Sequence, residues 1–298
     1  MKKRQTNQTL RMEELLETET RWEKVKHFMH TNKLATASLV FILFIILVAV
    51  FAPLFAPYDP GAQNTDIRLM PPSPQHLLGT DELGRDVLSR IIYGARISLV
   101  IGLVPTSLSM LIGIALGLMA GYLGKWADSI IMRLADIMLA FPSLLLAMVV
   151  TYTLGSGIVN IFIALSLVNW AGTARIVRAQ TISLKEGDMV EAARAIGVSK
   201  WKIMLRHILP SCLPSLIVQF TLDIPGSILS ESSLSFLGVG AQPPSTSWGL
   251  MVTRGKQYLF TEPWLAIAPG VVILLVVLAF NFLGDGLRDS LDPYMKEG

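Results

Sequence analysis

Cysteine and histidine are too sparse in this chain to build a disulfide or a metal centre. The single cysteine, Cys212, excludes an intrachain disulfide and a cysteine cluster for a metal. Of the four histidines, only His27 and His30 lie near each other, three residues apart in a charged segment. That spacing is more typical of a helix at a membrane surface than of a zinc site. We therefore expect no metal site.

A phosphate-binding loop is also missing. The pattern of Gly, four residues, Gly, Lys and then Ser or Thr occurs nowhere, and the nearest candidate, Gly124-Lys125, is followed by Trp126. We therefore expect a chain that is not an enzyme and binds no cofactor of its own. A partner subunit would have to bind ATP and Mg and supply the energy of ATP hydrolysis.

Charged residues are scarce, at 16% against 52% hydrophobic residues, and long uncharged runs recur. About 20 apolar residues are enough for a helix to cross the bilayer core, so the composition predicts an all-α integral membrane protein with six transmembrane helices. The first run, residues 34–58, follows a charged segment without a signal cleavage site, and we expect it to be retained. The further spans are expected at residues 97–124, 128–154, 158–178, 211–233 and 264–283.

The third and fourth spans share one uncharged run. Residues 137–174 are too many for one span and slightly too few for two. The LGSG sequence at residues 154–157 is the expected break, so the third span should begin near Asp128. Arg133 and Asp136 would then lie in its first turns, where their i, i+3 spacing lets them pair.

Six spans place both termini on one side of the membrane, and the basic residues indicate which side. One side carries 19 of the 25 Lys and Arg residues, and the other carries 6. Basic residues are enriched in cytoplasmic loops, so we expect both termini in the cytosol. The same asymmetry accounts for the formal net charge of +3, which therefore gives no reason to expect a nucleic-acid partner.

The predicted organisation has four parts. A cytoplasmic N-terminal segment, residues 1–33, forms either an amphipathic helix on the inner membrane surface or on a partner, or a solvated, partly ordered lead-in. Residues 34–96 hold the first span and an extracytoplasmic segment. Residues 97–283 form a core of five spans with a cytoplasmic loop at residues 185–210, and residues 284–298 form a cytoplasmic tail.

A polar, basic island, EAARAIGVSKWKIMLRHILP, occupies residues 191–210 between two apolar stretches. Residues 191–196 favour a helix, Gly197 interrupts it, and Ser199 is placed to cap a second helix at residues 200–208. Such an amphipathic element outside the bilayer needs either a groove on a protein or the lipid surface. We call residues 191–210 the EAA segment.

This segment resembles the EAA motif of ATP-binding-cassette importer permeases, in which Gly follows Glu-Ala-Ala after three residues and a Leu-Pro pair ends the motif. The residues at these positions are Glu191, Ala192, Ala193, Gly197, Leu209 and Pro210. Arg206 and His207 complete the RHILP form of peptide and nickel permeases. The resemblance implies that the segment, with Trp201 on its apolar face, docks into a groove of an ATPase subunit.

A second segment, HLLGTDELGRDVLSRIIYGARISL at residues 76–99, resembles the LGTD-x-x-GRD-x-x-SR segment of the same permeases. It is expected outside the cell. Thr80 or Asp81 is placed to cap a short helix, Asp86 lies one turn before Arg90, and Gly84 leaves the backbone approachable.

Two interpretations of this second segment stay open. Its residues, including Arg85, either form a surface that meets a binding protein or roofs the pathway, or form a folded loop held by its own ion pairs.

Further matches to this family occur at residues 169–180, 231–240, 247–249 and 284–293. The resemblance implies the type I importer (MetI-like) fold and the role of the second permease of a dipeptide or oligopeptide importer. It also implies the partners: a homologous permease in a heterodimer, two ATPase subunits that bind ATP and Mg, and an extracytoplasmic substrate-binding protein. The expected location is the bacterial cytoplasmic membrane.

Two carboxylates interrupt the fifth span. Asp223 lies beside Pro225, and Glu231 follows eight residues later on roughly the same helix face. Charges within a membrane are costly and usually face protein or water. Both carboxylates are candidates to line a peptide's route or to pair with the partner permease. Alternatively, Asp223 is satisfied by backbone groups that Pro225 frees, and Glu231 is simply wet near the outer end.

The substrate stays open at this point. Short peptides are the first candidate substrate, but similar permeases carry nickel or other metal chelates and glutathione-like compounds. In these systems selectivity resides largely in the binding protein. An intramembrane enzyme would need a paired acid, a metal or a nucleophile with its base, and the spans offer only scattered carboxylates. A secondary transporter would work without an ATPase and often shows inverted repeats, which are not evident here.

The charge asymmetry predicts the topology of two single-cysteine variants. In a Cys212-free background, cysteine at Ser245 should react with a membrane-impermeant thiol reagent from outside intact cells. Cysteine at Ser199 should react only after the cells are opened, because the loop that carries it is basic and cytoplasmic. The reverse labelling pattern would contradict the six-span topology.

Overall fold

The computed structural model describes residue 29, residues 31–155 and residues 157–291. The helix predicted within the N-terminal segment therefore lies almost entirely outside the described residues. Within them the chain is helical, with no β-strand and one isolated bridge between Thr80 and Asp86. The predicted all-α architecture is confirmed.

The elements follow one another along the chain without long gaps, except at residues 56–86. The α-helices are α3 (Lys33–Val50), α4 (Ala52–Phe55), α5 (Val87–Leu123), α6 (Lys125–Ala140), α7 (Ser143–Leu154), α8 (Ile158–Lys185), α9 (Asp188–Ala195), α10 (Lys200–Ile203), α11 (Leu209–Phe236), α12 (Trp248–Gly255) and α13 (Trp264–Leu291). Short helical turns occur at Thr65–Ile67 and Lys256–Tyr258, and a π-helical turn at Met204–Ile208 joins α10 to α11.

Among the described residues, five helical stretches are long and apolar enough to cross a membrane. They are α3, α5, α8, the continuous stretch Lys200–Phe236, and α13. The pair α6 and α7 passes the same test only when taken together, and the chain bends by 95° between them. The chain therefore has up to six crossings, with the third divided into two helices.

The third span, expected at residues 128–154, is not one continuous helix. α6 ends at Ala140, and Phe141 and Pro142 adopt non-helical backbone angles before α7 begins. Proline cannot donate a backbone hydrogen bond and biases the preceding residue away from the helical region, which explains the break.

The predicted pair between Arg133 and Asp136 does not form either. Asp136 instead accepts a hydrogen bond from Nη2 of Arg175 on α8 at 2.5 Å. Asp128 accepts two more from the guanidinium of Arg178, at 2.5 and 2.6 Å. Two ion pairs thus hold α6 along α8.

Three other features of the helices differ from the sequence expectation. α5 begins ten residues early, at Val87, because the side chain of Asp86 caps it by accepting the Ser89 N–H at 2.8 Å. α11 passes through Pro225 without a break, which membrane helices tolerate. α13 continues to Leu291, well beyond the predicted end of the sixth span.

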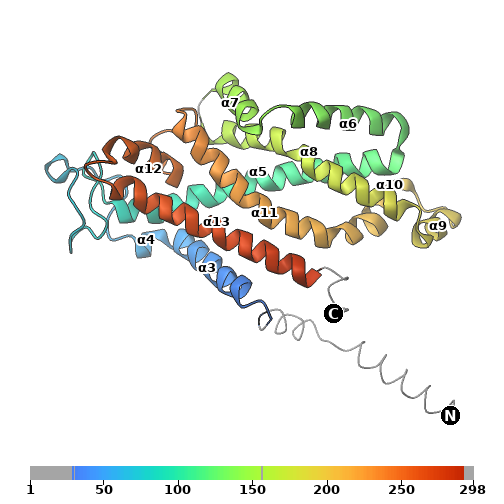
Figure 1. Cartoon of the computed structure of the whole chain (residues 1–298), viewed down its shortest axis with the longest axis horizontal. Coiled ribbons are helices and arrows are strands. Elements are labelled where there is room, and N and C mark those ends of the chain that lie inside the picture. The colour runs from blue at the N-terminus through green and yellow to red at the C-terminus, as the bar shows by residue number, and fades with distance from the viewer. Residues whose placement is uncertain (1–28, 30, 156, 292–298) are drawn as a thin grey trace, which may run out of the picture.

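The closest helix pair is α5 with α8, which lie side by side over most of their length (Figure 1). Three glycines spaced four residues apart on α5 face α8. A methyl group on Gly113 would lie 2.6 Å from Thr173 Cβ, and one on Gly117 would lie 2.7 Å from both the Ala174 carbonyl oxygen and Val177 Cβ. Small residues let helix backbones approach closely, which is how packing holds membrane helices together.

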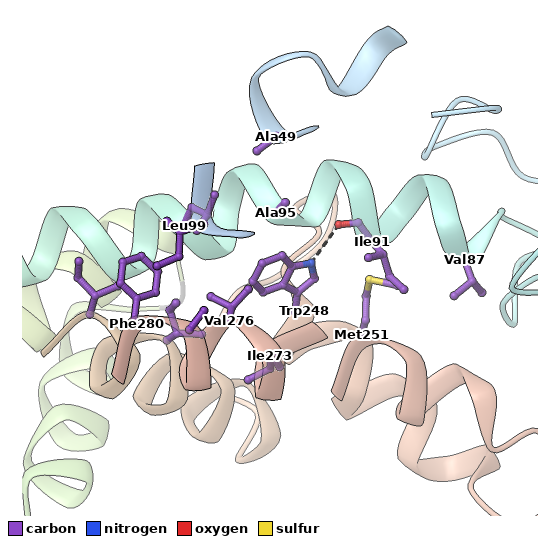
Figure 2. Packing of buried hydrophobic residues seen from close by; sticks show 14 of the residues in the cluster. Ala49, Val87, Ile91, Ala95, Leu99, Trp248, Met251, Ile273, Val276 and Phe280 are labelled. Carbon is purple, nitrogen blue, oxygen red and sulfur yellow. Dashed lines mark hydrogen bonds between the residues drawn. The ribbon is translucent and has the colours of Figure 1, made fainter. Parts of the chain in front are cut away.

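The core of one half of the molecule is organised around Trp248 at the start of α12. Its indole N–H donates to the Ile91 carbonyl at 3.0 Å, and its backbone N–H donates to Ser98 Oγ at 3.0 Å. Figure 2 shows the indole beside α5, with Val276 of α13 next to it. α12 is therefore fixed to α5 by hydrogen bonds and apolar packing together.

The two ends of the molecule carry different structures. Figure 1 places α9 and α10 at one end, and α4, residues 57–86 and α12 at the opposite end. The EAA segment and the LGTD-containing segment are therefore separated by the length of the helices.

The α5–α8 contact predicts a stability effect for one methyl group. Gly117→Ala should destabilise the protein by about 1–3 kcal/mol, because the new Cβ would overlap backbone and side-chain atoms of α8. Gly270→Ala is the matched control. Gly270 is also helical, and no atom of the described chain beyond its own stretch of helix would lie within 4 Å of the added Cβ. Thermal unfolding in detergent measures both variants, and equal melting temperatures would contradict the proposed tight packing.

Candidate functional site

The EAA segment folds as two short helices around a tight glycine turn. Gly197 has a φ of 77°, its N–H donates to the Arg194 carbonyl, and the Val198 N–H donates to the Ala193 carbonyl, both at 3.0 Å. These two bonds are those of a Schellman motif, whose left-handed residue is usually glycine. The glycine interruption predicted from the sequence is thus present.

The second helix differs from its prediction. The Ser199 side chain makes no capping hydrogen bond within the described residues, and α10 ends after four residues. The chain then continues through the π-helical turn at residues 204–208 directly into α11. The part of the EAA segment that follows Gly197 is therefore continuous with α11.

One side of the segment is buried against the ends of α5 and α8. Ala193, Ile203, Met204 and Ile208 pack there in one apolar cluster with residues of both helices, including Leu118. The buried side fixes the segment to the body of the protein.

The other side of the segment presents apolar side chains outward. Ile196 is 81% exposed and Trp201 is 60% exposed, while Glu191 and Ala192 are exposed beside them. Arg206 and Pro210 are exposed, and His207 and Leu209 are half-buried. Exposed large apolar groups outside the bilayer are typical of a surface that another protein covers.

A cavity of about 460 Å³ lies between α5, α6, α7, α8 and α11. Asp223 is half-buried in its wall, and its Oδ1 accepts a hydrogen bond from Gln219 Nε2 at 2.7 Å. The other lining residues are mostly small, polar or flexible: Thr106, Ser109, Met138, Leu139, Phe141, Ser143, Val168, Asn169, Gly172, Thr173, Leu222, Gly226, Ser227 and Ser230. We call this space the Asp223 cavity.

Sequence reasoning found Asp223 but missed the polar residues around it. Three of them, Gln219, Asn169 and Ser109, each lie within an otherwise apolar span. A polar residue in such a position was the sequence signal that could have indicated the cavity. The partner of Asp223 is the amide of Gln219, so the interpretation in which backbone near Pro225 satisfies the carboxylate is not supported.

Glu231 occupies a different place from Asp223. It is only 1% exposed, and its Oε1 accepts hydrogen bonds from Ser235 Oγ at 2.6 Å and Ser247 Oγ at 2.9 Å. Ser247 in turn caps α12 by accepting the Leu250 N–H at 3.1 Å. The expectation that Glu231 is exposed to water is wrong, because α12 covers its carboxylate. Glu231 also does not line the Asp223 cavity.

At the opposite end of the molecule, an ion-pair network holds the LGTD-containing segment. Asp81 Oδ2 lies 2.7 Å from Arg85 Nε and 3.3 Å from Arg90 Nε. Glu82 Oε1 lies 2.8 Å from Arg254 Nη1 and 3.2 Å from Arg85 Nη2. The network therefore ties this segment both to α5 and to α12.

Glu82 stays ionised at neutral pH in this network. Burial alone would raise the pKa of Glu82. A backbone hydrogen bond, the hydrogen bond from Arg254 and the charges of Arg85 and Arg254 outweigh burial, and leave this pKa below its ordinary value.

The capping predicted for Thr80 or Asp81 is wrong. Asp86 caps α5, and its other carboxylate oxygen lies 2.9 Å from His76 Nδ1, so Asp86 does not pair with Arg90. The Thr80 hydroxyl donates to the Ile67 carbonyl and accepts the Met70 N–H.

The chain itself fills the space beside Gly84. A side chain on Gly84 would collide with the backbone of Asn64. Thr80, Asp81, Arg85 and Asp86 are all buried, which favours a folded loop over a direct contact surface.

Comparisons with known proteins agree with this geometry. A family model described as the binding-protein-dependent transport system inner membrane component matches residues 113–297. A second, described as the N-terminal TM domain of oligopeptide transport permease C, matches residues 20–72.

Individual relatives match over nearly the whole chain. The dipeptide transport system permease protein DppC of Alkalihalophilus pseudofirmus is 45% identical over 92% of this chain and 90% of its own length. The glutathione transport system permease protein GsiD of Pectobacterium atrosepticum is 44% identical over 93% and 92%.

The fold is similar to a solved transporter. A chain of the MetNI methionine ABC transporter, in an inward facing conformation, has a TM-score of 0.55 and 20% identity, over 68% of this chain and 97% of that chain. At this identity the likeness concerns the fold alone. The family models and the relatives show that this chain belongs to the binding-protein-dependent transport system inner membrane components, as an ABC importer permease of the dipeptide and oligopeptide permease C type.

Proposed function

We propose that this chain is one of two permease subunits of an ATP-driven importer of short peptides. The observation that carries the proposal is the Asp223 cavity, whose polar wall is formed by spanning helices. Polar groups at membrane depth are tolerated where they line water or meet protein. A homologous permease facing this wall would complete the pathway and cover it from lipid.

The EAA segment is the proposed contact with an ATPase subunit. Its outward face carries Ile196 and Trp201, and its inner face packs on α5 and α8. Because it continues into α11, which carries Asp223, ATP-driven movement of the ATPase would reach the cavity wall through one helix. ATP and Mg would be bound by the two ATPase subunits, and substrate would arrive from an extracytoplasmic binding protein.

The substrate class is inferred from relatives named for dipeptide and di/tripeptide transport. Glutathione is a second candidate, because a relative of nearly equal identity is named for its transport. The proposed location is a bacterial cytoplasmic membrane with both termini in the cytosol.

Substitutions in the EAA segment should disconnect transport from ATP hydrolysis. Gly197→Val costs about 1–3 kcal/mol locally, since valine is strained at positive φ. It should abolish uptake and weaken co-purification of the ATPase while the permease stays in the membrane. Glu191→Lys should act similarly by reversing an exposed charge on the docking face.

Gly238 provides the matched control for backbone strain. Its φ is 86°, it lies at the opposite end of α11, and no described atom beyond its chain neighbours would lie within 4 Å of an added Cβ. Gly238→Val should leave ATPase co-purification intact. Normal uptake in both EAA variants would remove this segment from the mechanism.

Substitutions of Asp223 should separate a pathway role from a structural one. Asp223→Asn keeps the shape and can still accept the hydrogen bond from Gln219, so assembly should persist. Uptake should fall, most for peptides with cationic side chains, because the cavity loses its negative charge. Asp223→Leu should lower uptake further.

Membrane abundance and peptide uptake are measured for both variants, with Asp285→Asn as an exposed control on α13. Unchanged uptake in Asp223→Asn together with lost assembly in Asp223→Leu would refute the pathway role.

A further inference from the structure

The Asp223 cavity adjoins a second cavity of about 600 Å³, which lies nearer the end that carries α9 and α10. Its wall comes from α8, α11 and the last turns of α13, and includes Gln180, Ser215 and Arg288. Gln219 and Leu222 line both cavities. The two spaces are therefore neighbours along one face of α11.

Charge is distributed unequally between these cavities. Among the described residues, Asp223 is the only charged one that lines the first cavity, and Arg288 is the only one that lines the second. The two adjoining cavities thus have one acidic and one basic side chain at different depths. Asp223 lies within a span, where an ionisable group is costly and usually marks the path of a substrate or ion, whereas Arg288 is exposed near the end of α13.

The depth of the two charges follows from how α11 and α13 pack. These helices are antiparallel (Figure 1), and Gly284 of α13 lies against Leu222, because a methyl group there would be 2.6 Å from Leu222 Cδ2. Arg288 lies four residues beyond Gly284 along α13, and Asp223 lies one residue beyond Leu222 along α11. Because the two helices run in opposite directions, these two offsets add. At 1.5 Å per residue, the two Cα atoms are separated by about 7 Å along the helix axes.

That separation matches a short peptide. Extended residues advance by about 3.5 Å each, so the charged ends of a dipeptide are about 7 Å apart and those of a tripeptide about 10 Å apart. The long, flexible arginine side chain can accommodate this difference.

Apart from Arg288, the polar residues that line the second cavity are neutral and able to donate as well as accept hydrogen bonds. They include the amides of Gln180 and Gln219 and the hydroxyls of Ser211 and Ser215. Such groups suit the alternating N–H and C=O groups of a peptide backbone. They make no demand on the peptide's side chains.

We propose that the adjoining cavities hold a short peptide by its two ends. The α-ammonium group lies at Asp223, and the α-carboxylate lies at Arg288, so the carboxyl end leads toward the cytoplasm. This inference rests on the proposed function and adds the part of the substrate that the pathway recognises. The site selects peptides with free termini.

The test is peptide binding to the purified complex of both permeases and both ATPases, without the binding protein. Trialanine binding is measured by ligand-observed NMR, with N-acetyl-trialanine and trialanine amide as competitors. In the unmodified complex each blocked peptide should compete about tenfold more weakly than trialanine, the size expected for losing one charged hydrogen bond.

The variants should affect the two ends separately. Asp223→Asn should remove discrimination against the acetylated peptide only, and Arg288→Gln should remove discrimination against the amide only. Arg133→Gln and Asp285→Asn are matched controls, because both residues are exposed and neither lines either cavity. Both controls should retain both preferences.

Three outcomes would overturn this inference: no trialanine binding to the unmodified complex, equal binding of blocked and free peptides, or variants that lose both preferences together. Uptake of trialanine by the complete transporter with its binding protein is measured in parallel. Uptake without end-selective binding would leave the proposed function intact and reject only this site. Absence of uptake would reject the proposed function itself.

Discussion

The close contact between α5 and α8 is the packing constraint on which the rest of the structure depends. It requires residues without side chains at Gly113 and Gly117, because the α8 backbone and side chains occupy the space that a Cβ would need. The EAA segment rests on the ends of these two helices, and the Asp223 cavity uses residues of both for its wall. The LGTD-containing segment and its ion-pair network are anchored at the start of α5, where Asp86 caps the helix and Arg90 pairs with Asp81. A change in the spacing of α5 and α8 would therefore reach all three regions.

The bend between α6 and α7 forms part of the cavity wall. Pro142 ends α6, and Phe141 and Ser143 at the bend line the Asp223 cavity. The ion pairs of α6 with Arg175 and Arg178 hold it to α8 on one side of the bend. Polar groups that would be costly in lipid are thereby gathered on one wall, which supports the proposal that a second permease faces it.

Much of the site could be predicted from the sequence, because its signals are local. The glycine at position 197, the apolar spans and the charge of Asp223 each appear within a few residues of the chain. The failures concern partners that are distant in sequence. Arg175 takes the partner that Arg133 was expected to have, and Glu231 is buried because Ser247 and α12 fold over it. The cap predicted at Ser199 was also wrong, since Ser199 occupies the N-cap position of α10 but its side chain makes no capping hydrogen bond within the described residues.

Sequence alone determined that this chain is a multi-pass helical membrane protein, since hydrophobic length and the scarcity of charge are properties of contiguous residues. Its motifs also identified the permease family without any knowledge of contacts. Only the tertiary structure decided which polar groups share a cavity. Asp223 and Arg288 are 65 residues apart in the chain, and they line adjoining cavities because α11 and α13 pack antiparallel with Gly284 against Leu222. Helix packing sets such neighbours, and no local pattern of residues encodes the depth at which one helix meets another.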